Sequence, residues 1–342
     1  GQVTIDVPVT RWVDAALAVL DDEELGCGFF DWLSAYDGGD AGIAVVTYNR
    51  LALLKGCVAA LQTQTRPPAT ILIVNNASND DTHTYLNALA SKYPNQIIVA
   101  HLAENTGGAG GFSEGMRMAL ANGADWVWMM DDDARPHPVA LEELMEVAKD
   151  PANVYGSLAT KDLDTSWTTT LLDPHPHTID SAADVPNEAR VQSLPFLGFM
   201  VHRNLVQRIG LPDAGYFIAA DDIEYCMRAE RAGAQLLIAG KSRIEHPKSD
   251  RYEAHLPGRH LICLRLPPWK RYYDTRNRLL IARKYYGLRL LTQTVPGSFV
   301  RLFAALVYEP RKLAQLWAFC TGMFDGLLGI KGRRHTKWGI RQ

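Results

Sequence analysis

Apolar and polar positions alternate in a regular way between residues 43 and 130. Short continuous apolar runs, typical of strands buried on both faces, are separated by stretches in which apolar residues recur every three or four positions, as in helices. Strands that alternate with helices in this way predict an α/β fold with a mostly parallel sheet and right-handed crossovers. The predicted strands are 43–47, 70–74, 96–101 and 126–130, and the predicted helices are 51–62, 82–92 and 112–122.

The whole chain divides into three parts by pattern and composition. Residues 1–40 hold a strand pattern and a helix pattern before a break rich in glycine and aspartate, and we interpret them as an N-terminal appendage. The α/β pattern extends over 41–268, and 269–342 is helical and basic. Within the α/β part, a stretch rich in proline and histidine predicts a mobile loop over the ligand site. That loop is 173–186, followed by a predicted helix within 217–233 and a strand at 235–239.

Composition excludes several classes of protein. With 47% apolar and 21% charged residues, the chain has the composition of an ordinary globular protein, which excludes disorder and collagen-like architecture. It has no uninterrupted apolar run of about 18 residues, so we expect no transmembrane helix. Five cysteines without metal-ligand spacing, and no signal-peptide pattern at the start, favour a reduced, cytoplasmic location.

The net charge of −3 conceals an asymmetry along the chain. Residues 270–342 carry 15 lysines and arginines against 3 acidic residues, a net charge of +12, and the preceding residues carry −15. A basic region of this kind predicts an anionic partner, either a membrane surface or a nucleic acid. No nucleic-acid-binding module is recognisable in it, so we expect no nucleic-acid partner.

Polar or glycine-rich segments follow all four predicted parallel strands. Ligands of such sheets bind at the carboxyl ends of the strands, so these segments locate the expected site. They are residues 47–50, 75–81, 105–111 and 131–133.

Three adjacent carboxylates, Asp131, Asp132 and Asp133, come directly after the apolar run 126–130. They repel one another and are tolerable only if they are solvated or neutralised by a cation. On an extended segment Asp131 and Asp133 point the same way and can share a metal. Oxygen ligands suit Mg²⁺ or Mn²⁺, which usually bridge to phosphates. A solvated acidic turn is the alternative, but the position at a strand end favours the metal.

Two further groups carry candidate chemistry. Asp221 and Asp222 begin a predicted helix, where they are either first-turn acids that favour the helix dipole or a pair whose carboxylate acts as a general base. The apolar segment 217–220 that precedes them would desolvate a carboxylate and raise its basicity. His246 follows the strand 235–239 on a loop, as a structural histidine or as a further metal ligand.

The segment 105–111, with Asn105, Gly107 and Gly108, opens a helix. Glycines allow the backbone to approach a phosphate or a sugar closely, and the N-terminus of a helix offers N–H donors. The segment is not a P-loop, because it lacks the Gly-Lys-Ser/Thr ending. Alone it is weak evidence for a ligand, and the aspartates that follow strengthen it.

In combination these motifs resemble the inverting GT-A glycosyltransferases of family 2. The segments that carry the resemblance are 45–50, 73–78, 105–112, 126–133 and 217–228, within a similar region of roughly 42–285. The run NTGGAGGFSEGM with the later ANGADWVWMMDDDA is similar to bacterial galactofuranosyltransferases that initiate cell-wall galactan, and rhamnosyltransferases share much of this pattern. The resemblance does not extend to the first 40 residues.

The resemblance implies a role for each candidate side chain. Asp131, Asp133 and His246 would hold the metal, and Asp222 would be the general base. Asp132 is expected to face the donor sugar or ribose. Asn75 and Asn76 stand where many relatives have an aspartate, and an amide oxygen can still accept the uracil N3–H. The remaining implied residues are Thr47, Arg50, Asn105, Gly107 and Gly108 for the donor, and Asp221 and Trp269 in or beside the acceptor site.

The activity implied is metal-dependent transfer, with inversion, of galactofuranose from UDP-galactofuranose to a lipid-linked glycan. A rhamnosyltransferase that uses dTDP-rhamnose is the alternative within the family. A nucleotidyltransferase and a non-catalytic scaffold are the alternatives from other classes.

The basic C-terminal region contains an apolar stripe at helical spacing. It either packs on the body of the protein, mediates self-association, or lies on anionic lipid at the inner face of the cell membrane. The residues of the stripe are Leu313, Leu316, Trp317, Cys320, Met323, Phe324, Leu327 and Leu328.

Overall fold

The computed structural model describes residues 39–256 and 259–341 and separates the chain into two compact units, 1–39 and 40–342. The strand and helix predicted in the N-terminal appendage lie outside the described residues. The second unit contains every other predicted element, and the description below concerns this unit alone.

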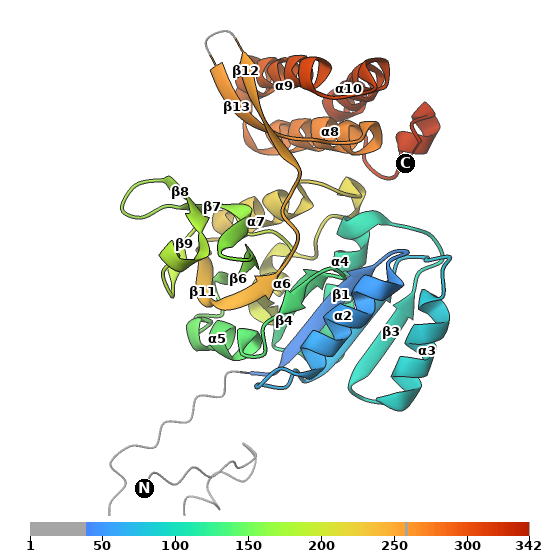
Figure 1. The fold of residues 1–342 in the computed structure, drawn as a ribbon, viewed down its shortest axis with the longest axis vertical. Helices are drawn as coiled ribbons and strands as arrows, with labels where there is room; N and C mark the ends of the chain where they lie inside the picture. The colour runs from blue at the N-terminus through green and yellow to red at the C-terminus, as the bar shows by residue number, and fades with distance from the viewer. Residues whose placement is uncertain (1–38, 257–258, 342) are drawn as a thin grey trace, which may run out of the picture. The chain divides into compact units, whose positions relative to one another are not determined.

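A mixed sheet of eleven strands forms the centre of the unit, within the described residues (Figure 1). Its main path runs β3-β2-β1-β4-β10-β6-β11-β5, with β7 and β8 extending from β6 and with β9 paired to β11. Strands β3, β2, β1 and β4 are parallel, β11 is parallel to β6, and β10 is antiparallel to both of its neighbours. The bounds are β1 Ala41–Thr47, β2 Thr70–Asn75, β3 Ile97–His101, β4 Trp126–Asp131, β5 Arg135–Pro136, β6 Val154–Lys161, β7 Asp164–Leu171, β8 His177–Ser181, β9 Ala189–Arg190, β10 Phe199–His202 and β11 Leu236–Glu245.

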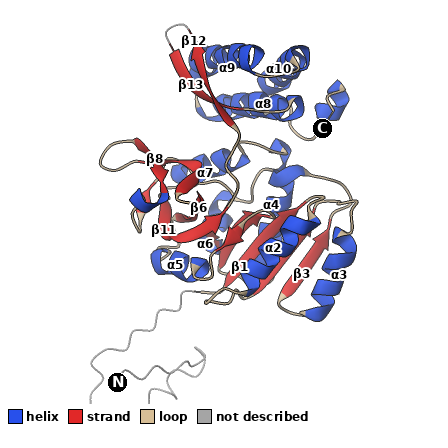
Figure 2. Ribbon diagram, in the orientation of Figure 1, coloured by secondary structure: helices blue, strands red, loops and turns tan. Residues whose placement is uncertain are grey.

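Helices cover both faces of this sheet, as Figure 2 shows in blue against the red strands. Alternate residues of β1 enter two different cores, because successive side chains of a strand point to opposite faces. Ile43 and Val45 pack with α2, α3 and α5, whereas Ala44 and Val46 pack with α4, α6 and α7. The bounds are α2 Leu51–Gln62, α3 Thr82–Lys92, α4 Gly107–Ala121, α5 Ala140–Val147, α6 Arg203–Ile209 and α7 Asp221–Arg231, with short 3-10 turns at Ala182–Asp184 and Ala214–Tyr216.

The C-terminal region is helical, as the sequence predicts. A two-stranded antiparallel hairpin precedes it, α8 packs against α10, and α10 packs against α9. The elements are β12 Arg251–Leu256, β13 Arg259–Leu264, α8 Pro268–Tyr285, a π-helical turn at Leu290–Thr294, α9 Val295–Tyr308, α10 Lys312–Leu328 and a 3-10 turn at His335–Trp338.

The apolar stripe predicted on α10 is at the surface over much of its length. Helix α10 buries Ala318 and Phe319 and leaves Leu313, Trp317 and Phe324 exposed. By length and composition alone, the continuous helical stretch Leu290–Tyr308 is able to cross a membrane, and only 22% of it is buried. The expectation of no transmembrane helix therefore meets one candidate among the described residues.

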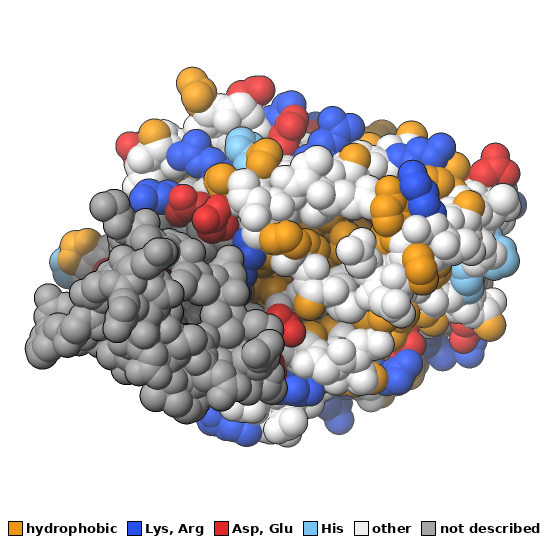
Figure 3. All heavy atoms as spheres, turned by 90° about the horizontal axis from the view of Figure 1, so that it is seen from below, with side chains coloured by type: hydrophobic (Ala, Val, Ile, Leu, Met, Phe, Trp, Pro, Cys, Tyr) orange, Lys and Arg blue, Asp and Glu red, His pale blue; other side chains and the backbone are white. Residues whose placement is uncertain are grey.

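The face drawn in Figure 3 carries charged and apolar side chains together. Lysine and arginine side chains lie around its edge with acidic side chains among them, and apolar side chains gather in a hollow near its centre. Both signs of charge are therefore present on this face.

Three local predictions were wrong. Helix α4 begins at Gly107 rather than at 112, because the glycines allow the helix to pack tightly on β1: a Cβ on Gly111 would lie 2.4 Å from Cγ1 of Val46. The segment 173–186 is not simply a loop, because it contains β8, which pairs with β7. Strand β11 continues to Glu245, past an irregularity in its pairing with β6 that the apolar run did not reveal.

Candidate active site

The carboxyl ends of the parallel strands bring the predicted site residues to one edge of the sheet. Thr47 at the end of β1 is in register with Asn75 at the end of β2. On the other side of β1, Val46 is in register with Asp131 at the end of β4. The polar segments that follow these strands are therefore neighbours in space, as the α/β pattern predicts.

Asp132 is the most enclosed of the three aspartates, with 3% of its surface exposed. The hydroxyl of Thr47 donates to its Oδ2 at 2.8 Å, and Nη1 of Arg50 lies 3.4 Å from its Oδ1. Burial raises the pKa of Asp132, and these two partners oppose that rise. Nη1 of Arg50 also donates to Oδ2 of Asp133 at 3.0 Å. Both oxygens of Asp132 are thus engaged by the protein, and the expected contact of Asp132 with the donor stays a prediction.

Asp131, Asp133 and His246 lie close enough to influence one another. Burial, and then the neighbouring carboxylates, raise the pKa of Asp131 to about 8. Burial acts in the same direction on Asp133, but His246 and Arg50 outweigh it and lower the pKa of Asp133. Burial lowers the pKa of His246, and the two aspartates outweigh it, so that this pKa is raised.

The polar atoms of this group are of the kinds that bind a divalent cation. Nε2 of His246 lies 3.4 Å from Oδ1 of Asp133, and that oxygen is buried without a hydrogen-bond donor. Nδ1 of His246 is also buried without a partner. The group thus combines two carboxylates, one of them with a strongly raised pKa, with an imidazole whose Nδ1 has no partner. Such donors suit Mn²⁺ or Mg²⁺.

The asparagines predicted for donor binding connect loops within the protein. The side-chain oxygen of Asn75 accepts from the N–H of Ser78 at 3.0 Å, and its Nδ2 is 3.0 Å from Nδ1 of His101. Nδ2 of Asn76 donates to the carbonyl of Gly107 at 2.8 Å, and its oxygen accepts from the N–H of Thr106 at 2.8 Å. Asn76 therefore holds the start of α4, whereas Asn75 connects the end of β2 to Ser78 and to His101 of β3. Direct contact of either amide with a nucleotide stays a prediction.

The N-terminus of α4 is partly occupied by the protein itself. Oδ1 of Asn105 accepts from the N–H of Gly107 at 2.8 Å, and the carbonyl of Phe217 accepts from the N–H of Ala109 at 3.1 Å. Gly107 has a φ of +74°, and a Cβ there would overlap the carbonyl of Phe217. The glycines therefore allow the segment before α7 to approach α4 closely. A role of Gly107 and Gly108 in binding the donor stays a prediction.

This same segment leads to the predicted base and has an unfavourable backbone. Phe217, Ala219 and Ala220 have φ values of +66°, +70° and +60°, which cost a non-glycine residue about 1–3 kcal/mol each. The segment ends at Asp221 and Asp222 in the first turn of α7. Burial raises the pKa of Asp222 to about 6 and, together with Asp222, that of Asp221 to about 7. An elevated carboxylate pKa is what a base at neutral pH requires.

Two buried side chains of α8 hold that segment in place, and neither was singled out from the sequence. Nδ2 of Asn277 donates to the carbonyls of Tyr216, Ile218 and Ala219 at 3.1, 2.8 and 2.7 Å. Nη2 of Arg276 donates to the carbonyl of Tyr216 at 2.8 Å. Both side chains are fully buried. In the sequence they are two polar residues of a basic run, and only the fold places them against the segment before α7.

Two residues at the start of α8 also lie at the site. Trp269 packs against the apolar cluster that contains Phe217 of the segment before α7, and its ring lies 6.4 Å from that of Tyr273. Lys270 was not predicted as a site residue; its pKa is lowered by burial and by Arg50, with Asp131 as a nearby opposing charge. Helix α8 thus brings an aromatic face and a cation to the two acidic groups. Within the described residues the carboxylate of Asp222 accepts only the N–H of Ile223, at 2.7 Å.

Comparisons with known proteins bear on the family of the chain. The family model "Glycosyl transferase family 2" matches residues 42–204. Galactofuranosyltransferase GlfT1 of Mycobacterium tuberculosis is 31% identical over 73% of this chain and 84% of its own length. The dTDP-rhamnosyl transferase RfbF of Shigella flexneri is 24% identical over 84% of this chain and 95% of its own.

A solved structure supports the fold. Mannosyltransferase PcManGT of Pyrobaculum calidifontis, in complex with GDP-Man and Mn²⁺, superposes with a TM-score of 0.53 at 14% identity. The match covers 93% of this chain and 94% of that one. The predicted α/β fold of the GT-A type is thereby confirmed.

Proposed function

The chain belongs to glycosyltransferase family 2, and we propose that it transfers galactofuranose from UDP-galactofuranose to a lipid-linked glycan with inversion at the anomeric carbon. As a glycosyltransferase it is neither a nucleotidyltransferase nor a non-catalytic scaffold. One observation carries the proposal. Asp133 with His246, and Asp132 with Thr47, lie together where the parallel strands β1 and β4 end. The choice of galactofuranose is supported by the likeness to galactofuranosyltransferase GlfT1, which is 31% identical.

Asp131, Asp133 and His246 would hold a divalent cation, Mn²⁺ or Mg²⁺. Such a cation, when bound, supplies positive charge that stabilises a diphosphate leaving group. The protein contributes the arrangement of the ligands: Thr47 and Arg50 engage Asp132, and Arg50 restrains Asp133 as well. Removal of either partner would free the acidic segment to change its conformation.

Asp222 would accept the proton of the attacking acceptor hydroxyl. Burial raises its pKa, which strengthens the carboxylate as a base. A single carboxylate is enough, because the leaving diphosphate needs no protonation by a second acid, in contrast to glycoside hydrolases with their two carboxyl groups. Asp221 and the ring of Trp269 would support or contact the acceptor. A lipid-linked acceptor resides in a membrane, so the proposal includes work at the inner face of the cell membrane.

A donor screen tests this function. The purified chain is given Mn²⁺, a synthetic rhamnosyl-GlcNAc diphospho-lipid and, in separate reactions, UDP-galactofuranose, UDP-galactopyranose or dTDP-rhamnose, and the products are weighed by mass spectrometry. We expect mass increments of hexose with UDP-galactofuranose alone. Turnover of dTDP-rhamnose instead would overturn the proposed sugar and favour the second candidate, a rhamnosyltransferase, which the likeness to RfbF supports.

A further inference from the structure

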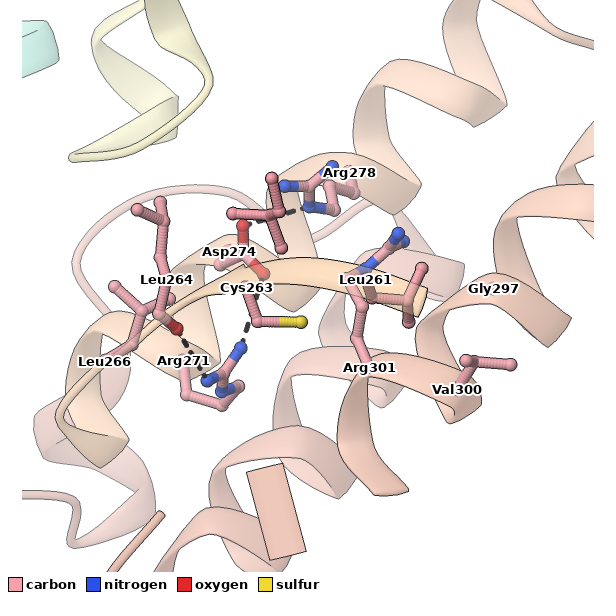
Figure 4. A pocket seen from close by; sticks show the side chains of 11 residues that line it. Leu261, Cys263, Leu264, Leu266, Arg271, Asp274, Arg278, Gly297, Val300 and Arg301 are labelled. Carbon is pink, nitrogen blue, oxygen red and sulfur yellow. Dashed lines mark hydrogen bonds and ion pairs between the residues drawn. The ribbon is translucent and has the colours of Figure 1, made fainter. Parts of the chain in front are cut away.

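A cavity of about 190 Å³ lies away from the strand ends, between β13, α8 and α9 (Figure 4). Three arginines line it, Arg271 and Arg278 from α8 and Arg301 from α9, together with one acidic residue, Asp274. In Figure 4 the guanidinium of Arg301 extends from α9 toward Arg278. Nothing in the proposed transfer reaction uses this cavity.

The cations of the cavity exceed its anions. Asp274 accepts from Nε of Arg278 at 2.9 Å, and the buried carboxylate of Glu309 accepts from Nη2 of Arg271 at 2.6 Å. Arg301 makes no hydrogen bond or ion pair with any residue that the structure describes, although it is partly buried. Three guanidinium groups therefore face two carboxylates, an excess of one positive charge in a partly buried place, where an uncompensated charge is costly.

A second observation points to a missing acceptor of hydrogen bonds. Nε of Arg271 is buried without a partner, and a buried donor in a native structure normally has one. Guanidinium groups match the oxygens of phosphate well, because several N–H donors converge on one anion. Three such groups beside one another suit an anion with several oxygens.

Part of the lining of the cavity is apolar and exposed. Ile262, which is 68% exposed, and Leu264 of β13 line it. Helix α9 contributes Val300 to the cavity and continues with Phe299 and Phe303 exposed, each by more than half. A soluble anion gains nothing from these exposed apolar side chains, whereas a lipid phosphate brings apolar chains with it.

We propose that this cavity binds the phosphate headgroup of an anionic membrane phospholipid, with the exposed apolar side chains of α9 against the acyl chains. The net charge of +12 in residues 270–342 is complementary to an anionic membrane. The inference rests on the proposed function in one respect, the premise that the enzyme works at a membrane. It does not depend on which sugar is transferred.

Calorimetric titration with dihexanoyl phosphatidylglycerol, a soluble anionic phospholipid, tests the proposal on the whole chain. Saturating UDP with Mn²⁺ is present to occupy the donor site. We expect saturable binding that Arg301→Gln weakens at least about tenfold, a loss of about 1.4 kcal/mol. Arg289→Gln is the matched control, because it removes the same charge from an exposed position between α8 and α9 outside the cavity. The affinity of the Arg289→Gln variant for the lipid should stay within about twofold of that of the unmodified chain.

Two further arms make the result decisive. Inorganic phosphate should bind at least about tenfold more weakly than the lipid, because it brings no apolar chain. Ile262→Asp places a negative charge, the same sign as that of the phosphate, at an exposed position of the lining and does not disturb the core. It should weaken lipid binding even if Arg301→Gln fails to fold. Equal affinity for phosphate and lipid would overturn the proposal, as would equal affinity of the Arg301 and Arg289 variants, or no binding by the unmodified chain. Because this titration involves no transfer, its failure is distinguishable from failure of the donor screen.

Discussion

Individual side chains of the site differ in how visible they are in the sequence. Asp131, Asp132 and Asp133 are adjacent and follow an apolar run, so their position at a strand end follows from local pattern alone. Lys270 and Asn277 carry no such signal, because they reach the site only through long-range packing of α8. Sequence reasoning therefore finds groups whose neighbours in space are also neighbours in the chain.

Asp222→Asn should abolish transfer while donor binding is retained. The amide keeps the size of the carboxylate but cannot accept a proton, and loss of a general base costs about 100- to 10,000-fold in rate. Turnover with the lipid acceptor and calorimetric titration of UDP in Mn²⁺ measure the two properties. Glu230→Gln, an exposed acid of the same helix, is the control and should behave like the unmodified chain. Near-normal turnover of Asp222→Asn would exclude this residue as the base.

The rate should fall in acid at a higher pH than it would for an ordinary carboxylate. Burial raises the pKa of Asp222 to about 6, so protonation removes the active form as the pH falls through that value. We expect kcat/KM to be level above about pH 7 and to decline about tenfold per pH unit well below pH 6. A pH–rate profile with saturating Mn²⁺ measures this. A profile that remains level down to pH 4.5, roughly the range of an unperturbed carboxylate, would contradict it.

At the scale of elements, the parallel strands and the helices between them were predictable, because each is a local run of one periodicity. The start of α4 was not, because its glycines favour a loop by propensity and form a helix only where they pack on β1. The contact between α8 and the segment before α7 was equally hidden. That contact has a functional consequence, because three residues of the segment have a left-handed backbone. Asn277 binds the carbonyl of one of them, Ala219, and those of the adjacent residues Tyr216 and Ile218.

Asn277→Ala should lower kcat and leave the KM for the donor nearly unchanged. The substitution removes this donor from three backbone carbonyls, at a cost of about 1–3 kcal/mol, and releases the segment that ends at Asp222. Kinetics with varied donor give the two constants, and the melting temperature gives the loss of stability. Asn122→Ala removes a bond to a helix carbonyl at an exposed position and serves as the control. An unchanged kcat in a destabilised Asn277 variant would show a purely structural role.

At the scale of the whole molecule, composition indicated the charge asymmetry but not the packing across it. The pattern changes near residue 268 from α/β to helical, yet 40–342 form one compact unit. Periodicity reports the type of an element and not its partners, so a change of pattern is not a boundary of folding. The stability of this unit should depend on the proposed cation, because its acidic cluster is held together against charge repulsion.

Mn²⁺ should raise the melting temperature, and a chelator should reverse the rise. At about one hundred times the dissociation constant the expected stabilisation is about 2.7 kcal/mol. The pKa of Asp131 is raised from 3.8 to about 8. Without metal, the folded state is therefore destabilised progressively as the pH rises from about 4 toward 8. The rise caused by Mn²⁺ should therefore be larger at pH 8 than at pH 6, as differential scanning calorimetry can measure.

Asp131→Asn provides the comparison. It should melt at or above the temperature of the metal-free unmodified chain at pH 8, and Mn²⁺ should no longer shift it. Asp213→Asn, at an ion pair with Lys331 that is partly exposed, should retain the shift. A shift by Mn²⁺ that persists in Asp131→Asn would place the ion elsewhere.

The anchoring of the base segment by α8 bears on how this enzyme can be engineered. A shortened version that ends before residue 268, made to improve solubility, would lose Trp269, Arg276 and Asn277 along with the apolar helices. Its inactivity would then say nothing about lipid attachment, because catalysis and attachment would have been removed in one cut. Polar replacements at exposed positions such as Phe303 and Leu313 solubilise the protein without touching that anchor.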